Sequence, residues 1–183
     1  LDLKNGTLTR RVEWESPNGD TLAIIWEHLV SYQYKNIGAM RVRIEHKGIN
    51  PVTLLSGSAG PDSRLENRDD PRVSSSHAVS PLVQISRIEE KREQFVSVQT
   101  LFRTKNSGLS LLCGNALSVI SGQECESIPD AQNETSFYCI SSPAPDGSDS
   151  SIIEIEKLYF YCIAPKKDED RLYSEYRTSL EHG

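Results

Sequence analysis

The fold is decided near the start of the chain by two strand-like runs and the turn between them: Leu8-Thr9-Arg10-Arg11-Val12-Glu13-Trp14, Asn18-Gly19 and Leu22-Ala23-Ile24-Ile25-Trp26-Glu27-His28-Leu29. Asn-Gly between two strand-like runs is a strong hairpin signal, because a type I′ turn needs positive φ at both central residues. A two-residue loop would pair Trp14 with Ala23 and Val12 with Ile25. The predicted core face then consists of Leu8, Val12, Trp14, Ala23, Ile25 and Leu29. Because the opposite face also carries apolar residues, we expect this hairpin to be covered on both sides.

More strands are predicted further along the chain. The segment 40–45 alternates apolar and charged residues, as a half-exposed antiparallel strand should. Strand-like runs recur at 52–55, 82–86, 94–102, 109–120 and 151–164, and the charged residues 89–93 are predicted to form a solvated turn. Apolar residues then recur at helical spacing over 168–181. The sequence therefore predicts an all-β antiparallel sandwich with a C-terminal helix.

Length and charge narrow the class of protein. A chain of 183 residues suits one all-β domain. The net charge of −6 argues against a protein that binds the phosphate backbone of nucleic acids, because such a protein carries a basic surplus. No apolar run approaches the roughly 20 residues of a membrane span, and no signal peptide begins the chain. We expect neither nucleic acid nor a membrane as a partner.

The cysteines and histidines do not predict a metal site. The four cysteines lack the C-x-x-C spacing of zinc sites, and the four histidines are scattered without ligand spacing. Cys113 and Cys162 lie in strand-like apolar runs, where a thiol packs as a small hydrophobe. Reduced core thiols are favoured over a disulfide framework, which indicates a cytoplasmic protein.

No catalytic motif is found in the sequence. General acid–base catalysis often uses two carboxylates on either side of the bond that breaks. Glu13 with Glu15, and Glu154 with Glu156, share strand faces, but this spacing is common on solvent-facing strands. No Gly-x-Ser-x-Gly elbow and no Gly-rich phosphate loop occurs. No motif in this chain therefore points to a particular catalytic residue.

The best candidate for a binding segment is a long polar loop within 57–80. A loop of this length inside a compact domain is unusual, and is typically functional or disordered. Its side chains suit sugar hydroxyls or an intersubunit contact, and its candidate site residues are Asp62, Arg64, Asn67 and Arg68. The alternative is a solvated loop whose charges satisfy one another. Tyr32 and Tyr34 end a strand, and are either a stacking platform for a sugar or exposed residues without a ligand.

Several segments resemble one enzyme family. The pattern Leu1-Asp2-Leu3-x-x-Gly6-x-Leu8-x-Arg10 is similar to a block in the N-terminal β-sandwich domain of the family 65 glycoside hydrolases and phosphorylases. The similarity continues through residues 30–45, where the family pattern is V-S, a short polar stretch, a small residue, an aliphatic residue and R-x-x-(I/V). Ile155-Glu156-Lys157-Leu158 resembles a late strand of the family with the pattern (L/I)-x-K-(L/Y/F).

The resemblance implies a fold and a domain plan. The fold would be an antiparallel supersandwich of the galactose mutarotase type with a C-terminal helix. Residues 1–166 would be part of the N-terminal β-sandwich domain, and residues 167–183 would begin a linker helix towards an (α/α)6 catalytic barrel outside this chain. The loop with Asp62, Arg64, Asn67 and Arg68 would lie close to the substrate.

The resemblance also implies a function for the parent protein. The parent would be a homodimeric phosphorylase that cleaves maltose, trehalose or kojibiose, with inorganic phosphate as co-substrate and no cofactor. This chain would support the barrel active site and dimerisation without a catalytic residue of its own. Two alternatives stay open: the same domain of an acid-trehalase-type hydrolase, and a stand-alone carbohydrate-binding sandwich.

Overall fold

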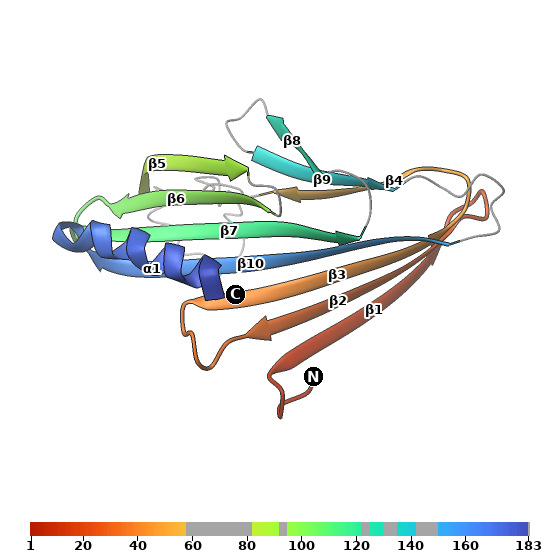
Figure 1. Cartoon of the computed structure of the whole chain (residues 1–183), viewed down its shortest axis with the longest axis horizontal. Helices are drawn as coiled ribbons and strands as arrows, with labels where there is room; N and C mark the ends of the chain where they lie inside the picture. Colours follow the sequence, from red (N-terminus) through yellow and green to blue (C-terminus); the bar gives the residue numbers. More distant parts are fainter. Residues whose placement is uncertain (58–81, 92–94, 122–124, 130–134, 142–149, 183) are drawn as a thin grey trace, which may run out of the picture.

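The computed structural model describes residues 1–57, 82–91, 95–121, 125–129, 135–141 and 150–182. In these residues two antiparallel sheets are accompanied by one C-terminal α-helix (Figure 1). The strands are β1 (Thr7–Glu15), β2 (Thr21–Val30), β3 (Ile37–Lys47), β4 (Val52–Gly57), β5 (Leu82–Lys91), β6 (Val96–Thr104), β7 (Leu109–Ser121), β8 (Cys125–Pro129), β9 (Thr135–Ser141) and β10 (Ser151–Pro165). A short 3-10 turn, η1 (Lys166–Asp168), leads into α1 (Glu169–His182).

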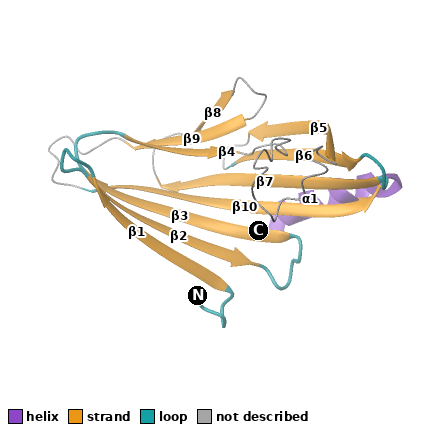
Figure 2. Ribbon diagram, turned by 180° about the vertical axis from the view of Figure 1, so that it is seen from behind, coloured by secondary structure: helices purple, strands orange, loops and turns teal. Residues whose placement is uncertain are grey.

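The large sheet has seven strands in the order β1-β2-β3-β10-β7-β6-β5, and the small sheet has the order β4-β9-β8. Strand β10 lies at the centre of the large sheet, between β3 and β7 (Figure 2). The small sheet covers one side of the large sheet, and α1 lies across β7 and β10 on the other side. The predicted class, an all-β antiparallel sandwich with a C-terminal helix, is confirmed.

The side of the large sheet that packs on the small sheet, which we call the inner face, carries the first core. Val42 and Ile44 of β3 pair in register with Ile155 and Ile153 of β10, and all four are almost fully buried. Val52 and Leu54 of β4 pack against them. The alternation predicted for residues 40–45 is confirmed, because Arg41, Arg43 and Glu45 lie on the opposite face.

The opposite side, which we call the helix face, carries the second core beneath α1. Leu172 and Tyr176 of the helix are buried against Leu112, Phe160 and Cys162 of the sheet. The rings of Phe160 and Tyr176 meet edge to face, with their centroids 5.3 Å apart. Because a helix of this length is marginal in isolation, packing of its apolar face stabilises it. The predicted helix over 168–181 is confirmed, with a shift of one residue at each end.

The register predicted for the first hairpin is wrong by one residue. Trp14 lies opposite Leu22 and Val12 opposite Ile24, because the connection has five residues, 16–20, instead of two. The Ser16 hydroxyl accepts the N–H groups of Asn18 at 3.2 Å and Asp20 at 3.0 Å, and these hydrogen bonds hold the longer loop. Because successive side chains point to opposite faces of the sheet, a register shift of one residue changes which residues of β1 and β2 share a face.

The predicted core face of the hairpin changes accordingly. Leu8, Val12 and Trp14 share the inner face with Leu22, Ile24 and Trp26, while Ala23, Ile25 and Leu29 lie on the helix face. Leu8 is 49% and Trp14 52% exposed, so neither is a core residue. On the helix face, no described layer covers this hairpin, and the prediction of two covered sides is also wrong.

Two further strand predictions are settled by the pairing. Residues 89–91 continue β5 and pair with β6, so the predicted turn at 89–93 is wrong for this part. Strand β7 does continue past Gly114 to Ser121, as predicted. Residues 125–129 and 135–141, to which no strand was assigned from the sequence, form β8 and β9 of the small sheet. The predicted loop within 57–80 lies outside the described residues from position 58 onwards.

Candidate functional site

A charged surface covers the part of the helix face that α1 leaves open. Alternation along β3 and β10 turns Arg41, Arg43, Glu154 and Glu156 to this face, while their neighbours enter the inner core. Residues of β3 and β10 that are more than 100 positions apart in sequence meet here because the two strands are adjacent in the sheet. We call this surface the open helix face.

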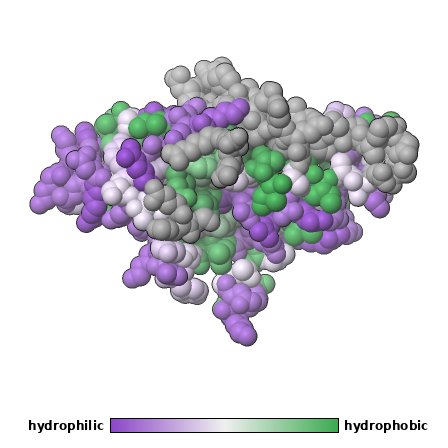
Figure 3. Space-filling model, viewed as in Figure 1, coloured by the Kyte–Doolittle hydropathy of each residue, from purple (hydrophilic) through white to green (hydrophobic). Residues whose placement is uncertain are grey.

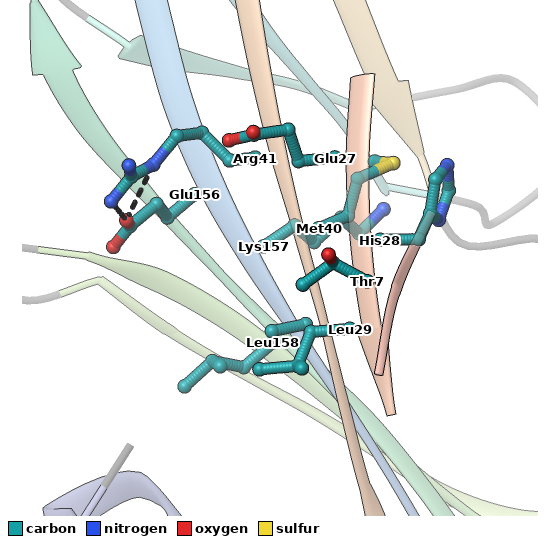
Figure 4. Close-up of a pocket in the computed structure, with 10 residues that line it drawn as sticks. Thr7, Glu27, His28, Leu29, Met40, Arg41, Glu156, Lys157 and Leu158 are labelled. Carbon is teal, nitrogen blue, oxygen red and sulfur yellow. Dashed lines mark hydrogen bonds and ion pairs between the residues drawn. The ribbon is translucent and has the colours of Figure 1, made fainter. Parts of the chain in front are cut away.

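The ion pairs of the open helix face form a connected network. Arg41 Nε donates to Glu156 Oε1 at 3.0 Å, and Arg41 Nη2 bonds to the same oxygen (Figure 4). Glu154 lies between two guanidinium groups, 3.6 Å from Arg41 Nε and 3.5 Å from Arg43 Nη1. Arg43 Nε also contacts Glu45 at 3.0 Å. The hydrogen bond and charge of Glu156 raise the pKa of Arg41 above its usual value.

This network explains why the Glu154 and Glu156 pair does not resemble a catalytic pair. Both carboxylates share a face, as predicted, but each is paired with arginine. A catalytic carboxylate must be within reach of a substrate, whereas the oxygens of these two residues are already engaged by guanidinium groups. The geometry therefore suits recognition of another surface better than proton transfer.

A groove of about 290 Å³ crosses the open helix face beside the network. Its apolar floor runs in register across three strands, from Leu29 of β2 through Ala39 of β3 to Leu158 of β10. Glu27, Arg41 and Glu156 form its polar wall (Figure 4). In the space-filling view, hydrophobic side chains are visible near the middle of the molecule, and hydrophilic side chains dominate its left end (Figure 3). An apolar floor with an ordered polar wall is a typical composition for a contact surface.

A buried lysine is the most unusual polar group on the inner face. Lys157 Nζ donates to Ser56 Oγ of β4 at 3.0 Å and so links the two sheets. It also lies 5.4 Å from the centre of the Tyr159 ring. Burial lowers the pKa of Lys157. The only sequence signal for this residue was the pattern (L/I)-x-K-(L/Y/F), which did not indicate that the lysine would be buried between sheets.

The residues selected from the sequence do not come together into one site. Asp62, Arg64, Asn67 and Arg68 lie outside the described residues. Tyr32 is 88% exposed in the connection between β2 and β3, and Tyr34 is less exposed. In the part of the chain that the structure describes, no three His, Cys, Asp or Glu side chains form a group that could hold a metal ion. Within the same residues, no helix is long and apolar enough to cross a membrane.

One family model and several known proteins are similar to this chain. The model of the glycosyl hydrolase family 65 N-terminal domain matches residues 1–180. The α,α-trehalose phosphorylase of Geobacillus stearothermophilus is 31% identical over 114 residues, which are 62% of this chain and 14% of that protein. The α,α-trehalose phosphorylase of Thermoanaerobacter brockii is 22% identical over 173 residues, which are 94% of this chain and 21% of that protein.

A solved structure described as a kojibiose phosphorylase from the human microbiome has the same fold. It matches 99% of this chain with a TM-score of 0.66 and 13% identity, and this chain covers 22% of it. The chain thus spans between 14% and 22% of the length of these three proteins. The match of the family model over residues 1–180 shows that this chain belongs to glycosyl hydrolase family 65 and corresponds to its N-terminal domain.

Proposed function

We propose that this chain is the non-catalytic N-terminal domain of a larger disaccharide phosphorylase, and that its open helix face docks the catalytic domain. The observation that carries the proposal is the surface beside α1 that no described element covers, where an arginine–glutamate network borders an apolar groove. Interfaces between domains of one chain combine apolar and polar groups in this way. Docking beside α1 would also place the contact next to the segment proposed as the linker, residues 167–183, with residues 1–166 as the sandwich.

The proposed chemistry of the parent follows from the family and from the names of the relatives. It is the phosphorolysis of an α-glucosyl disaccharide, with inorganic phosphate as co-substrate and no cofactor. An (α/α)6 barrel would supply the catalytic residues, and the parent would be a cytoplasmic homodimer. The loop that contains Asp62, Arg64, Asn67 and Arg68 would border the active site. Replacement of these four residues by Ala should then change disaccharide selectivity in the intact enzyme, and unchanged selectivity would argue against that role.

Leu29→Arg tests the docking surface. Leu29 is partly exposed in the groove floor, so the substitution should shift the melting temperature of this chain by only about 2 °C. In the intact enzyme the same charge would be buried without a partner, and phosphorolysis should fall by at least about tenfold. Ile163→Arg is the matched control, because Ile163 is exposed on the inner face of the sheet. Equal effects of the two substitutions on the intact enzyme would contradict docking through the groove.

Product analysis of the intact enzyme tests the proposed reaction. A phosphorylase should release glucose 1-phosphate from maltose, trehalose or kojibiose only when phosphate is present. Release of glucose without phosphate would favour the alternative, a hydrolase of the acid-trehalase type. The second alternative, a stand-alone carbohydrate-binding sandwich, predicts saturable heat when this chain is titrated with glucose or maltose in a calorimeter, whereas a scaffold predicts none.

A further inference from the structure

Two Asn-Gly pairs occur in the described residues, Asn5-Gly6 and Asn18-Gly19. An asparagine that precedes glycine can lose its side-chain amide spontaneously. Glycine permits this reaction because it has no Cβ atom to keep its backbone nitrogen away from the preceding side chain. The fold holds the two pairs differently, and this difference decides which of them can react.

The pair Asn5-Gly6 is restrained on both sides. The side-chain N–H of Asn5 donates to Asp2 Oδ2 at 2.6 Å, and its backbone N–H donates to Asp2 Oδ1 at 3.2 Å. A Cβ atom at Gly6 would lie 3.4 Å from Tyr32 Cε2, so the glycine is packed against a ring. The side-chain amide and the backbone nitrogen of this pair are therefore held in place.

The pair Asn18-Gly19 is much less restrained. Both residues are exposed at the tip of the first hairpin, and within the described residues no hydrogen bond holds the Asn18 side chain. A Cβ atom at Gly19 would meet nothing within 4 Å. The N–H of Gly19 donates to Ser16 O at 2.9 Å. Because an exposed hydrogen bond at the tip of a loop opens at low cost, the Gly19 nitrogen can become free to react.

We propose that Asn18 is a modification site, at which the chain forms isoaspartate slowly and without an enzyme. The Gly19 nitrogen bonds to Asn18 Cγ, the bond from Cγ to Nδ2 breaks, and ammonia leaves with the proton of the Gly19 N–H. The product is a cyclic imide, which water then opens. Attack of water on the backbone carbonyl leaves an isoaspartate, in which the main chain runs through the former side chain. Attack on the side-chain carbonyl leaves an ordinary aspartate.

The position of Asn18 gives this modification a structural effect. Isoaspartate lengthens the main chain by a methylene group between Ser16 and Asp20, and the Ser16 hydroxyl accepts the Asp20 N–H at 3.0 Å. The Asp20 carboxylate accepts the N–H of Ile49 at 3.0 Å, and so ties the hairpin to the connection between β3 and β4, which lies at the same end of the large sheet (Figure 1). The modification should therefore loosen the hairpin from the connection that leads into the small sheet.

Peptide mass spectrometry of the chain after incubation at neutral pH tests the proposal. Isoaspartate, identified by electron-transfer fragmentation, should form at Asn18 at least about fivefold faster than at Asn5. In urea the restraints on Asn5 are lost, and the two rates should come within about threefold of each other. Equal rates in the folded chain, or no isoaspartate at Asn18, would overturn the proposal. The site shares no residue with the proposed docking groove, so the outcome is independent of the proposed function.

Hydrogen exchange at Ile49 tests the structural effect. Its amide should exchange at least about tenfold faster in the isoaspartate form than in the fresh chain, because the acceptor on Asp20 is displaced. Asn18→Ser is the matched control, since serine suits a turn and has no amide to lose, and its exchange should not change during incubation. Fresh Asn18→Asp gains the charge without the longer main chain and should keep Ile49 protected. Unchanged exchange in the isoaspartate form, or an equal increase in fresh Asn18→Asp, would contradict this effect.

Discussion

The contact between Gly114 of β7 and Tyr176 of α1 predicts that an added methyl group will loosen the helix from the sheet. A Cβ atom at Gly114 would lie 3.0 Å from Tyr176 Cζ and 3.1 Å from Cδ2, and closer still to Cε2. Carbon atoms pack best at about 3.5–4.0 Å, so the ring would have to move by at least about 0.5 Å. The ring is 2% exposed and packs against Phe160, so it cannot turn away freely.

The expected size of the effect follows from two opposing contributions. Gly→Ala substitution alone stabilises a protein by about 0.4–1 kcal/mol where the backbone permits it, because the unfolded chain loses freedom. Overpacking of a core costs about 1–3 kcal/mol. Gly114→Ala should therefore lower the free energy of unfolding by about 1–2 kcal/mol and the melting temperature by about 2–8 °C.

Gly38→Ala in β3 is the matched control. Neither glycine has a positive φ, so both substitutions restrict the unfolded chain equally. A Cβ at Gly38 would meet only the carbonyl oxygen of Leu29, at 3.5 Å, which is an ordinary contact. Gly38→Ala should therefore raise the melting temperature by a few degrees in thermal unfolding followed by circular dichroism.

A double-mutant cycle identifies the cause of the loss. In a Tyr176→Leu background the crowded ring atoms are gone, so Gly114→Ala should cost less there than in the unchanged chain. If Gly114→Ala is as stable as Gly38→Ala, or costs the same with and without the ring, the reasoning from this contact is refuted.

Two further predictions concern the attachment of α1. Hydrogen bonds from Ser110 and Arg103 lower the pKa of Glu169 in the folded chain. The ionised carboxylate therefore stabilises the fold fully at a pH above the pKa of Glu169 in the unfolded chain. This stabilisation is lost as the pH falls through the lower pKa of the folded chain. Glu169→Gln should therefore cost about 1 kcal/mol at pH 7, and urea unfolding should show the difference closing below about pH 4. Burial is the main cause that raises the pKa of the Cys162 thiol to about 11, and the hydrogen bond to Glu175 is the second. Iodoacetamide at pH 8 should therefore label Cys162 only after the chain unfolds. Rapid labelling of the folded chain would contradict this environment.

Regular alternation made some elements predictable from the sequence. One face of β3 is buried, and its apolar residues Val42 and Ile44 lie two positions apart. One stripe of α1 is buried, and its residues Leu172 and Tyr176 lie one turn apart. In both cases the pattern is local, because one element and one partner layer determine it. Both elements were therefore found close to their observed bounds.

The register of the first hairpin was not predictable, because it depends on contacts with residues that are far from the Asn-Gly turn in the sequence. Gly19 does adopt a positive φ of 87°, as the Asn-Gly pair indicates. The Asp20 carboxylate, however, accepts the N–H of Ile49 at 3.0 Å and a hydrogen bond from the Asn50 side chain. These contacts tie the hairpin to the connection between β3 and β4, and they keep Asp20 in the loop. Long-range partners of this kind leave no periodic signal in the sequence.

The candidate surface was hidden from the sequence for a related reason. The charged residues of β3 and β10 were visible as the solvent sides of two separate strands, but nothing local indicates that β3 and β10 are neighbours. Only this pairing brings Arg41 to Glu156 and Arg43 to Glu154. The loop chosen instead was conspicuous because of its composition, and composition gives no position in space.

Strand β10 shows why the surfaces left uncovered are a consequence of the fold. In its first half the buried side chains are Ile153, Ile155 and Lys157, which face the small sheet; in its second half they are Phe160, Cys162 and Ala164, which face α1. The covering layer thus changes sides in the middle of the strand. The first half alternates apolar residues with Glu154 and Glu156, whereas the second half is apolar on both faces, so the sequence does not show on which side the second half is covered. Each half is left with one face that no described layer covers, and on the first half that face carries the arginine–glutamate network. Among the described elements, one helix and a three-stranded sheet are too small to cover both faces of the seven-stranded sheet, so the area that they leave open can bind another domain without displacing any part of the core.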